Sequence, residues 1–506
     1  MSHHRPTRSP KRVVVIGAGV GGLACAVRLA KKGHSVSIFE ASDHVGGKCR
    51  TEWIDGYAFD TGPSLLTLPA VYRDLFLKTG KRLEHILKLE PVDPSFTYIF
   101  HDGTRIVFPN LSHNGTVAAI SAQLGEAAGR DWHALLQRAE AMWEASRESF
   151  IEGELRSPLQ LLNRPHLFSD LRTISPLTSL RSLSTSMTSN SYLHKIIDRY
   201  ATYTGSDPRK VPAVLLTIAF VEEAFGAWHI QGGLGSLPVS LEARARELGV
   251  EINLNTPVSS INTHNGSAHG VVLHDGREIS ADVVVANADA DIVYNKLLEP
   301  MRETRRARQA LKKATPSLSG FSLLLGLRGK SDLNHHTVYF PENYDDEFDA
   351  IFHRKEPVPN PAIYICNPKD PLMVKNHNSE SWFVLINAPR HEPENGCDWN
   401  SPGLKERYAE HIIDLMESKG LDIRSRLDVC EIRTPADLAS RTNAPGGSIY
   451  GTSSNGARSA FLRAKNRSPI KNLYCVGGSA HPGGGLPLVG ISAEIVAEAV
   501  EELAEQ

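Results

Sequence analysis

Cysteine is scarce in this sequence and follows no pattern. Only six of the 506 residues are cysteines, and no two of them form a C-x-x-C pair. Disulfide frameworks and cysteine-based metal sites need regular, close spacings. His335 and His336 are adjacent, but no third ligand stands at helical spacing from them, so we expect surface or loop histidines. The sequence therefore predicts no disulfides and no metal site, and a reducing cytoplasm is its simplest location.

Long apolar runs and an excess of one charge are absent as well. No stretch of 18 apolar residues occurs, and the mean hydropathy is −0.24, so no membrane span is predicted. The formal net charge of −2 gives no electrostatic reason to expect nucleic acid as a partner. Residues 1–12 are basic but carry no signal-type apolar segment. We expect them to form a short disordered arm.

The sequence over residues 13–39 predicts a strand, a glycine-rich turn, a helix and a second strand. In this order, Gly17 allows a tight turn, Gly19 a close approach of the backbone to a pyrophosphate, and Gly22 close packing of helix on strand. The start of the helix offers free N–H groups and the positive end of its dipole to phosphates. A glycine-rich turn without a ligand is the alternative. The strand and helix around the motif favour a dinucleotide site.

Glu40 follows the second strand. At this distance from the first glycine a carboxylate can accept hydrogen bonds from a ribose diol, and it would repel a 2′-phosphate. FAD or NAD is therefore favoured over NADP.

A second glycine motif, Gly46-Gly47-Lys48-x-Arg50, decides between these two cofactors. It resembles the second glycine motif of the large flavoprotein family that includes amine oxidases, carotenoid desaturases and the GDP dissociation inhibitors. The resemblance implies FAD. It also implies that Gly47 lies close to the cofactor and that Arg50, with Lys48 beside it, meets phosphate.

Two later segments carry the same resemblance. The strand ending at Val258 is similar to the family strand that holds the adenine through its backbone. Residues 476–487, VGGSAHPGGGLP, resemble the signature of bacterial phytoene-desaturase-type enzymes, and the family's amine oxidases lack the His-Pro-Gly-Gly-Gly run. A helix is predicted to start near Val489. By resemblance its first N–H groups lie under the flavin, and the implied cofactor residues here are Gly477, Gly478, Leu488 and Val489.

Three further side chains are candidates for a substrate cavity. Trp228 and His229 precede a glycine-rich element, residues 231–235, that lies near the flavin edge in the family. His481 belongs to the C-terminal signature. A lone histidine is more often a packed core residue, and that alternative stays open.

The predicted fold class is α/β, with a Rossmann-like FAD-binding domain, an inserted αβ substrate domain and a helical, membrane-facing subdomain. The discontinuous FAD domain is predicted from residues 1–82, 226–294 and 441–506. Residues 83–116 and 295–440 form the predicted substrate sheet. Residues 117–225 form the predicted helical part.

Two patterns inside these domains leave alternatives open. Phe96, Tyr98 and Phe100 alternate along a predicted strand, and we favour core packing over a cavity wall. Residues 157–189 interleave leucine and arginine, with three prolines. That composition suits attachment to an anionic lipid surface and equally an ordinary helical subdomain. The lipophilic substrate implied by the resemblance favours peripheral membrane attachment.

The resemblance implies FAD-dependent desaturation of an acyclic carotenoid, either phytoene or a later intermediate. Such a hydrocarbon has no charged group, so an apolar tunnel must recognise it. A hydride passing to flavin N5 and a proton leaving the neighbouring carbon would extend the polyene, and oxygen or a quinone would reoxidise the flavin. No strong protein base is needed, so the sequence names no catalytic residue.

Other functions of the same superfamily remain alternatives. The wording of residues 228–233 leans toward relatives that desaturate hydroxylated carotenoids. A carotenoid ketolase, a saturase and an amine oxidase are further enzymatic alternatives. A lipid escort of the GDP dissociation inhibitor type is the alternative without enzymatic activity.

Overall fold

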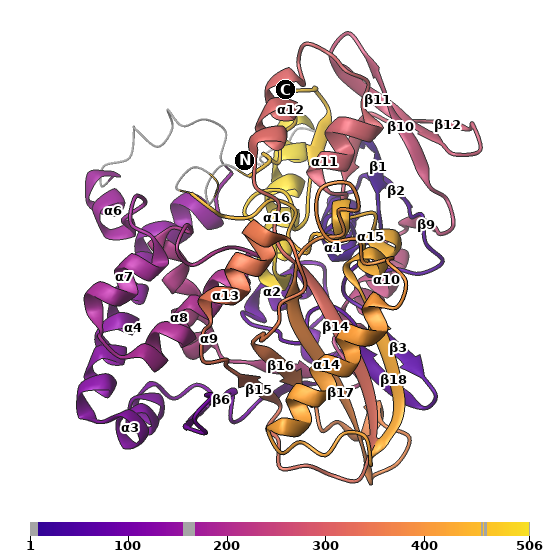
Figure 1. The fold of residues 1–506 in the computed structure, drawn as a ribbon. Coiled ribbons are helices and arrows are strands. Elements are labelled where there is room, and N and C mark those ends of the chain that lie inside the picture. The colour runs from indigo at the N-terminus through magenta and orange to yellow at the C-terminus, as the bar shows by residue number, and fades with distance from the viewer. Residues whose placement is uncertain (1–8, 155–166, 457–458, 460–462, 505–506) are drawn as a thin grey trace.

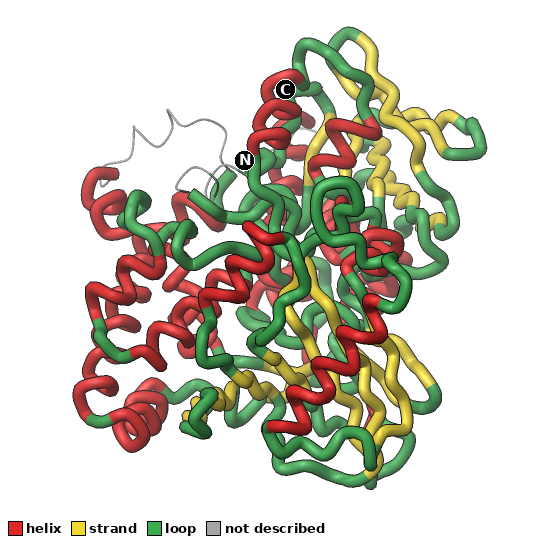
Figure 2. The backbone as a smooth tube through the Cα atoms, in the orientation of Figure 1, coloured by secondary structure: helices red, strands yellow, loops and turns green. Residues whose placement is uncertain are grey.

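The computed structural model describes residues 9–154, 167–456, 459 and 463–504. Two sheets organise these residues, and a group of helices stands beside the larger sheet (Figure 1). Figure 2 shows the same division as a helical side and a strand-rich side of the molecule. None of the described helices is long and apolar enough to cross a membrane.

The first sheet is parallel and has five strands. Its order is β19-β13-β1-β2-β9, and every neighbouring pair is parallel. Its central strand reads RVVVI and is buried on both faces, as expected for a parallel sheet covered on both sides. Helices α1 (Val20–Lys31) and α16 (Leu486–Ala504) pack side by side against it. The strands are β1 (Arg12–Ile16), β2 (Ser35–Phe39), β9 (Glu251–Asn253), β13 (Val283–Ala286) and β19 (Leu473–Cys475).

The second sheet has seven strands in the order β18-β14-β17-β16-β15-β6-β7. All its neighbours are antiparallel except β15 and β6, which run parallel. Helix α14 (Leu404–Ser418) covers one face through Ile412, Ile413 and Met416. The strands are β6 (Phe96–Ile99), β7 (Arg105–Phe108), β14 (Ser319–Arg328), β15 (His336–Tyr339), β16 (Ile363–Cys366), β17 (Ser379–Ala388) and β18 (Leu427–Arg433).

The opposite face of this sheet meets the other two parts of the molecule. Leu324 and Phe383 on this face pack against Tyr57 and Phe59 of β4 (Tyr57–Asp60). At the β6 end, Phe96, Tyr98 and Phe100 are buried against the helices. The alternating aromatics are thus core residues, as the sequence favoured, and this sheet face joins the cofactor side to the helical side.

The helices beside the second sheet occupy the left of Figure 1. Trp132 and Tyr200 are fully buried where these helices meet the sheet. The helices are α3 (His113–Leu124), α4 (Glu126–Ser146), α6 (Leu167–Ile174), α7 (Leu180–Met187), α8 (Ser191–Thr202) and α9 (Thr217–Phe225).

The remaining elements connect these parts. Strands β10, β11 and β12 form a separate three-stranded antiparallel sheet next to the parallel sheet. Two short two-stranded sheets, β3 with β4 and β5 with β8, lie between the domains. Their bounds are β3 (Thr51–Ile54), β5 (Leu89–Pro91), β8 (Trp228–Ile230), β10 (Val258–His264), β11 (Ser267–Leu273) and β12 (Glu278–Ser280). The helices are α2 (Ala70–Lys78), α10 (Ser236–Glu247), α11 (Ala290–Ile292), α12 (Arg305–Lys313), α13 (Asp345–Asp349) and α15 (Pro435–Thr442).

The predicted α/β fold class is confirmed by this parallel sheet and its helices. All three sequence segments assigned to the cofactor domain supply strands of the parallel sheet. Strand β13 pairs with both β1 and β19. Each of these two partners is almost 200 residues or more away from β13 in the sequence. The domain boundaries themselves stay a prediction.

A buried carboxyl group on α13 makes stability depend on pH. Burial raises the pKa of Glu347 to about 7, although Asn387 Nδ2 and the Ala362 N–H both donate to the carboxylate at 2.8 and 2.7 Å. Unfolded, this group releases its proton near pH 4.5. Between these values the folded chain binds more protons, so the free energy of unfolding falls as pH rises, by about 3 kcal/mol in total.

We expect Glu347→Gln to remove this fall. The Asn387 amide can turn over to accept from the new amide group, so the packing is retained. The free energy of unfolding of the variant, relative to that of the wild type, should rise by about 3 kcal/mol between pH 4 and pH 8. Urea unfolding at the two pH values measures it. An equal difference between the two proteins at both pH values would contradict the assignment.

Candidate functional site

The turn between β1 and α1 is closed so tightly that only glycine fits. Gly17 has φ +91°, and a Cβ there would lie 2.7 Å from the Asn287 carbonyl oxygen. At Gly22 a Cβ would lie 2.2 Å from the Gly17 oxygen, and at Gly19 it would lie 2.7 Å from Asn287 Nδ2. The absence of side chains leaves the turn open to a ligand's close approach.

Helix α1 begins at this turn without a side-chain cap. Gly19 is the N-cap residue, no side chain accepts a hydrogen bond there, and the first turn contains no acidic residue. The first N–H groups and the positive end of the helix dipole are therefore left for an anion.

Glu40 stands at the end of β2 beside the same turn. Its carboxylate accepts from the Ala18 N–H at 2.6 Å and from the Ser42 N–H and hydroxyl, both at 2.8 Å. These contacts fix the carboxylate next to the glycine turn, where the sequence predicted a ribose partner. A carboxylate can accept further hydrogen bonds from a diol in this position.

The second glycine motif lies directly on the first. The Gly46 N–H donates to the Ala18 carbonyl at 2.9 Å, and a Cβ at Gly47 would lie 3.4 Å from Gly19 Cα. Arg50 is one quarter exposed, and its guanidinium lies 3.8 Å from Glu52. Burial lowers the pKa of Arg50, while Glu52 opposes the shift.

Lys48 is held by the segment that precedes the C-terminal signature. Its ammonium donates to the carbonyl oxygens of Ser448 and Ile449, at 2.8 and 2.7 Å. Burial lowers the pKa of Lys48, and the carboxylate of Asp289 opposes that shift. Lys48 thus ties the second glycine motif to the segment that leads into the C-terminal signature.

The C-terminal glycines meet the start of α1 from the other side. A Cβ at Gly21 would lie 3.1 Å from both Gly477 Cα and Val489 Cγ1. Gly477 has φ +102°, and its N–H donates to Ser492 Oγ at 3.2 Å. Gly478 approaches Gly484, so the signature folds back on itself before α16 begins at Leu486. Leu488 and Val489 lie in the first turn of that helix, both partly buried.

Val258 opens β10 beside the ends of β1 and β2. It pairs with Leu273 and packs against a buried cluster that includes Ile16 and Phe39. Its backbone therefore lies beside the carboxyl ends of the central strands, where the adenine was predicted.

Asn287 is a site residue that the sequence did not single out. It follows β13, and its atoms lie close to the positions that a Cβ would take at Gly17, Gly19, Gly21, Gly22 and Gly477. Its amide nitrogen donates to the Gly17 carbonyl at 3.4 Å. A polar residue directly after a buried strand was the signal available, but the contact joins positions 270 residues apart.

These features fit the pyrophosphate of FAD. A cradle that any Cβ would fill, an uncapped helix start and a fixed carboxylate meet at one edge of the parallel sheet. Gly17, Gly19, Gly22 and Gly47 would hold the pyrophosphate, Glu40 the ribose, and the start of α16 would lie at the flavin end.

The predicted cavity residues lie in two places. His229 is buried and its Nε2 lies 2.9 Å from Asp370 Oδ2, which also accepts from the Gly232 N–H. Trp228 is partly buried, with its indole N–H on the Phe225 carbonyl at 2.8 Å. Both belong to β8, next to the glycine-rich element.

His481 has a separate environment. Its Nε2 lies 2.9 Å from the Gly153 carbonyl oxygen, and burial lowers the pKa of its imidazole. The Asn466 amide donates to the His481 carbonyl at 2.9 Å. The ring is therefore a neutral, packed element of the C-terminal signature.

The expectation of surface or loop histidines at 335 and 336 is wrong for His336 and right for His335, which lies in the bend before β15 and is partly buried. His336 is fully buried in β15, and burial also lowers the pKa of His335 to about 3. The reason is tertiary: β15 lies inside the seven-stranded sheet, between β16 and β6, which the local sequence does not reveal.

Comparison with known proteins places the chain in a family. Residues 20–348 match the family model described as flavin-containing amine oxidoreductase. A 1-hydroxycarotenoid 3,4-desaturase of Flavobacterium sp. (strain P99-3) is 32% identical over 97% of this chain and 99% of its own length. The chain belongs to the flavin-containing amine oxidoreductase family. Within it, a zeta-carotene-forming phytoene desaturase of Myxococcus xanthus is 31% identical over 96% of this chain and 93% of its own length.

Solved structures of amine oxidases share the fold. Cyclohexylamine oxidase from Brevibacterium oxydans matches with a TM-score of 0.62 and 18% identity, covering 98% of this chain and all of its own. The protein is an FAD-dependent oxidoreductase of the carotenoid desaturase type. Flavin as the cofactor is thus confirmed by the family, and the geometry of the glycine turns agrees with it.

Proposed function

We propose that this flavoprotein desaturates an acyclic carotenoid, phytoene or a later intermediate. The observation that carries the proposal is the near-full-length similarity to two carotenoid desaturases in a chain whose three glycine segments meet at one turn. A hydride would leave one saturated carbon of the substrate for bound FAD, a proton would leave the neighbouring carbon, and the new double bond would form between the two carbons. Amine oxidation is the less favoured activity because these two relatives act on carotenoids.

The contribution of the protein itself is binding and orientation. The face of the second sheet that meets β4 and the helices connects the cofactor side to the helical side, and it carries one apolar cluster at its contact with β4 and another at its contact with the helices. An apolar surface recognises a hydrocarbon by shape and keeps water away from the reacting carbons. We place the substrate along this junction, with Trp228 and His229 on its β8 side.

A hydroxylated acyclic carotenoid is the second candidate substrate. The 1-hydroxycarotenoid desaturase relative favours it, and so does a buried polar group at the junction. Arg199 stacks over the rings of Phe96 and Tyr364, and its guanidinium donates to the Tyr203 hydroxyl at 3.0 Å. A pure hydrocarbon has no use for a cation in this place, whereas a terminal hydroxyl group has.

The test is an anaerobic half-reaction with the FAD-loaded protein. Liposomes carrying phytoene form one arm, liposomes carrying a 1-hydroxylated acyclic carotenoid the second, and empty liposomes the control. We expect loss of the oxidised flavin band together with new polyene absorption at longer wavelength in one substrate arm. A band that stays oxidised in both arms would reject desaturation of these substrates, and a product that gains oxygen after aeration would indicate an oxygenase.

Oxygen or a quinone is our proposed electron acceptor. The reduced protein from the half-reaction can be mixed with air-saturated buffer or with a quinone in liposomes. The faster return of the flavin band identifies the acceptor.

We also propose that the protein is cytoplasmic and attaches peripherally to the membrane that holds its substrate. Of the segment 157–189, residues 157–166 lie outside the described residues. In the rest, Leu180 and Leu183 are buried, and Arg181 pairs with Asp198 and Asp345 at 2.7 and 2.6 Å. These side chains have partners within the fold and are not available to lipid. Among the described residues of the segment, Leu177 is 92% exposed, and we propose that it contacts the lipid.

Leu177→Ser is expected to weaken membrane attachment about 10- to 100-fold, because a buried leucine side chain contributes about 1.5–3 kcal/mol. Flotation with anionic liposomes measures the bound fraction. Val239→Ser is the matched control, since Val239 is 59% exposed but lies on α10, on the other side of the molecule (Figure 1). Equal flotation of the wild type and Leu177→Ser would argue against attachment through this residue.

A further inference from the structure

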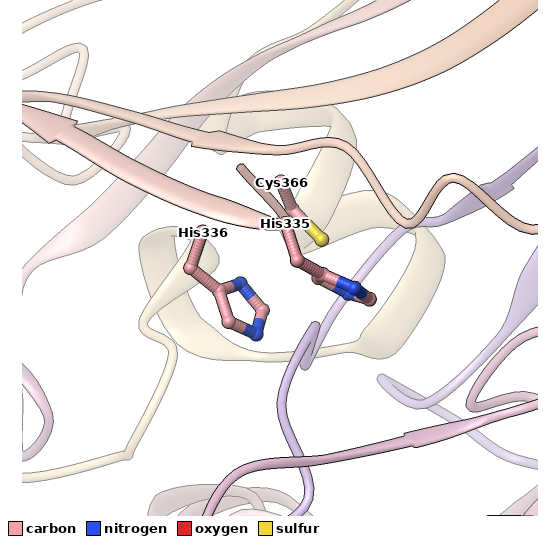
Figure 3. Close-up of side chains that lie close together, drawn as sticks. All are labelled: His335, His336 and Cys366. Atoms are coloured by element: carbon pink, nitrogen blue, oxygen red, sulfur yellow. The ribbon is translucent and has the colours of Figure 1, made fainter. Parts of the chain in front are cut away.

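Three potential metal ligands converge on the face of the second sheet that meets the cofactor side. The ligand atoms of His335, His336 and Cys366 all lie within 4.8 Å of one another. Figure 3 shows the three side chains extending into one space. His336 and Cys366 are paired directly across β15 and β16, so their side chains share a face, and His335 immediately precedes β15.

Two of these ligands have buried nitrogen atoms without a partner. Among the described residues, Nε2 of His335 and Nε2 of His336 are buried and form no hydrogen bond. Buried polar atoms are nearly always paired, since an unpaired one costs about 1–3 kcal/mol. Two such atoms beside a buried thiol therefore point to a missing partner that accepts electron pairs.

The contacts of His336 leave Nε2 as the nitrogen without a partner. Its Nδ1 lies 2.7 Å from the Tyr364 hydroxyl, which lies 2.7 Å from Ser64 Oγ. In the tautomer that a metal selects, His336 Nδ1–H donates to Tyr364, Tyr364 donates to Ser64, and Nε2 carries the lone pair. Histidine ligands of metals are usually held in this way by a second hydrogen bond.

We propose that His335, His336 and Cys366 bind one soft metal cation, Cu⁺ or Zn²⁺. Thiolate and imidazole are the ligands such cations prefer, whereas Mg²⁺ and Ca²⁺ need several oxygen ligands. Binding forms a metal–sulfur bond, and the Cys366 thiol releases its proton to solvent. The metal is not oxidised or reduced in this step.

Charge favours Cu⁺ of the two cations. Cu⁺ and the Cys366 thiolate cancel, so the buried site gains no net charge, whereas Zn²⁺ leaves one positive charge. The groups that act electrostatically on the cluster are two cations, Arg199 and Lys369, two carboxylates, Asp60 and Asp370, and the His229 imidazole, whose ring lies 5.2 Å from that of His335. The cations and the carboxylates balance each other and do not offset an added positive charge.

The test is competitive titration of the reduced, FAD-loaded protein. In one arm Cu⁺ is offered with a Cu⁺ indicator, and in the other Zn²⁺ with a zinc indicator. We expect about one equivalent of metal to bind, with a metal–sulfur distance of about 2.3 Å for zinc in X-ray absorption. Binding of either cation at this stoichiometry supports the site. The cation that binds with the higher affinity is its occupant.

Variants decide whether these residues are the ligands. Cys366→Ser should lower the affinity at least 100-fold and remove the metal–sulfur signal, and Tyr364→Phe should lower the affinity 10–100-fold. Cys430→Ser is the matched control, because Cys430 is the exposed cysteine on β18. Flavin content shows whether each variant is folded. Absence of uptake by the wild type, or unchanged affinity in folded Cys366→Ser, would overturn the proposal.

Discussion

Gly22→Ala is expected to abolish FAD binding. A Cβ at this position would lie 2.2 Å from the Gly17 carbonyl oxygen and 3.1 Å from Asn287 Cβ. The clashing oxygen belongs to the backbone and cannot rotate away as a side chain can. Helix α1 must therefore move away from β1, and the pyrophosphate site widens. We expect at least a 100-fold weaker FAD affinity and a loss of about 2–3 kcal/mol in stability.

Flavin content after reconstitution and the unfolding temperature with and without FAD measure both effects. Gly249→Ala is the control, because nothing lies within 4 Å of the added Cβ there, although Gly249, unlike Gly22, has a positive φ of +84°. It should cost about 1 kcal/mol and leave flavin content unchanged. Normal flavin content in Gly22→Ala would show that the turn does not hold the cofactor.

Lys48→Met is expected to destabilise the protein by about 3–5 kcal/mol, the cost of leaving a buried charge without its compensating charge. The change leaves the carbonyl oxygens of Ser448 and Ile449 without their donor. It also removes the main positive charge that opposes the burial of Asp289, whose pKa burial raises. The segment before the C-terminal signature should loosen, so flavin content should fall as well.

A double-mutant cycle separates these causes. Asp289→Asn removes the carboxylate that Lys48 compensates, so the double variant should be more stable than the sum of the two single changes predicts. Urea unfolding of the four proteins gives the coupling. Strict additivity would mean that Lys48 acts through the two carbonyls alone.

Local signals in the sequence predicted much of the cofactor site. Gly17, Gly19 and Gly22 belong to one strand–turn–helix unit, and Glu40 follows its second strand, so short-range spacing sufficed to place them together. The structure brings Gly47 and Gly477 to the same turn. Those two positions came from resemblance to a family, because no physical rule links segments more than 400 residues apart.

Side chains whose partners are distant in sequence could not be placed in this way. Lys48 was expected beside phosphate, and the structure shows its ammonium on carbonyls 400 and 401 residues away. Asn287 was passed over, although it touches the glycine turn. Arg181 lies in the leucine- and arginine-rich segment that suited either a lipid surface or a helical subdomain, and the structure pairs it with Asp345, 164 residues further along the chain.

The sequence alone determined the α/β class and a dinucleotide site, because short glycine motifs and buried strands are local, and its resemblance to a known family supplied the flavin cofactor and the family. The tertiary structure alone decided the environment of His335 and His336. Their burial depends on which strands flank β15, and their convergence with Cys366 depends on the β15–β16 register. Strand order and register arise from contacts across the whole chain, so a reading of neighbouring residues cannot supply them.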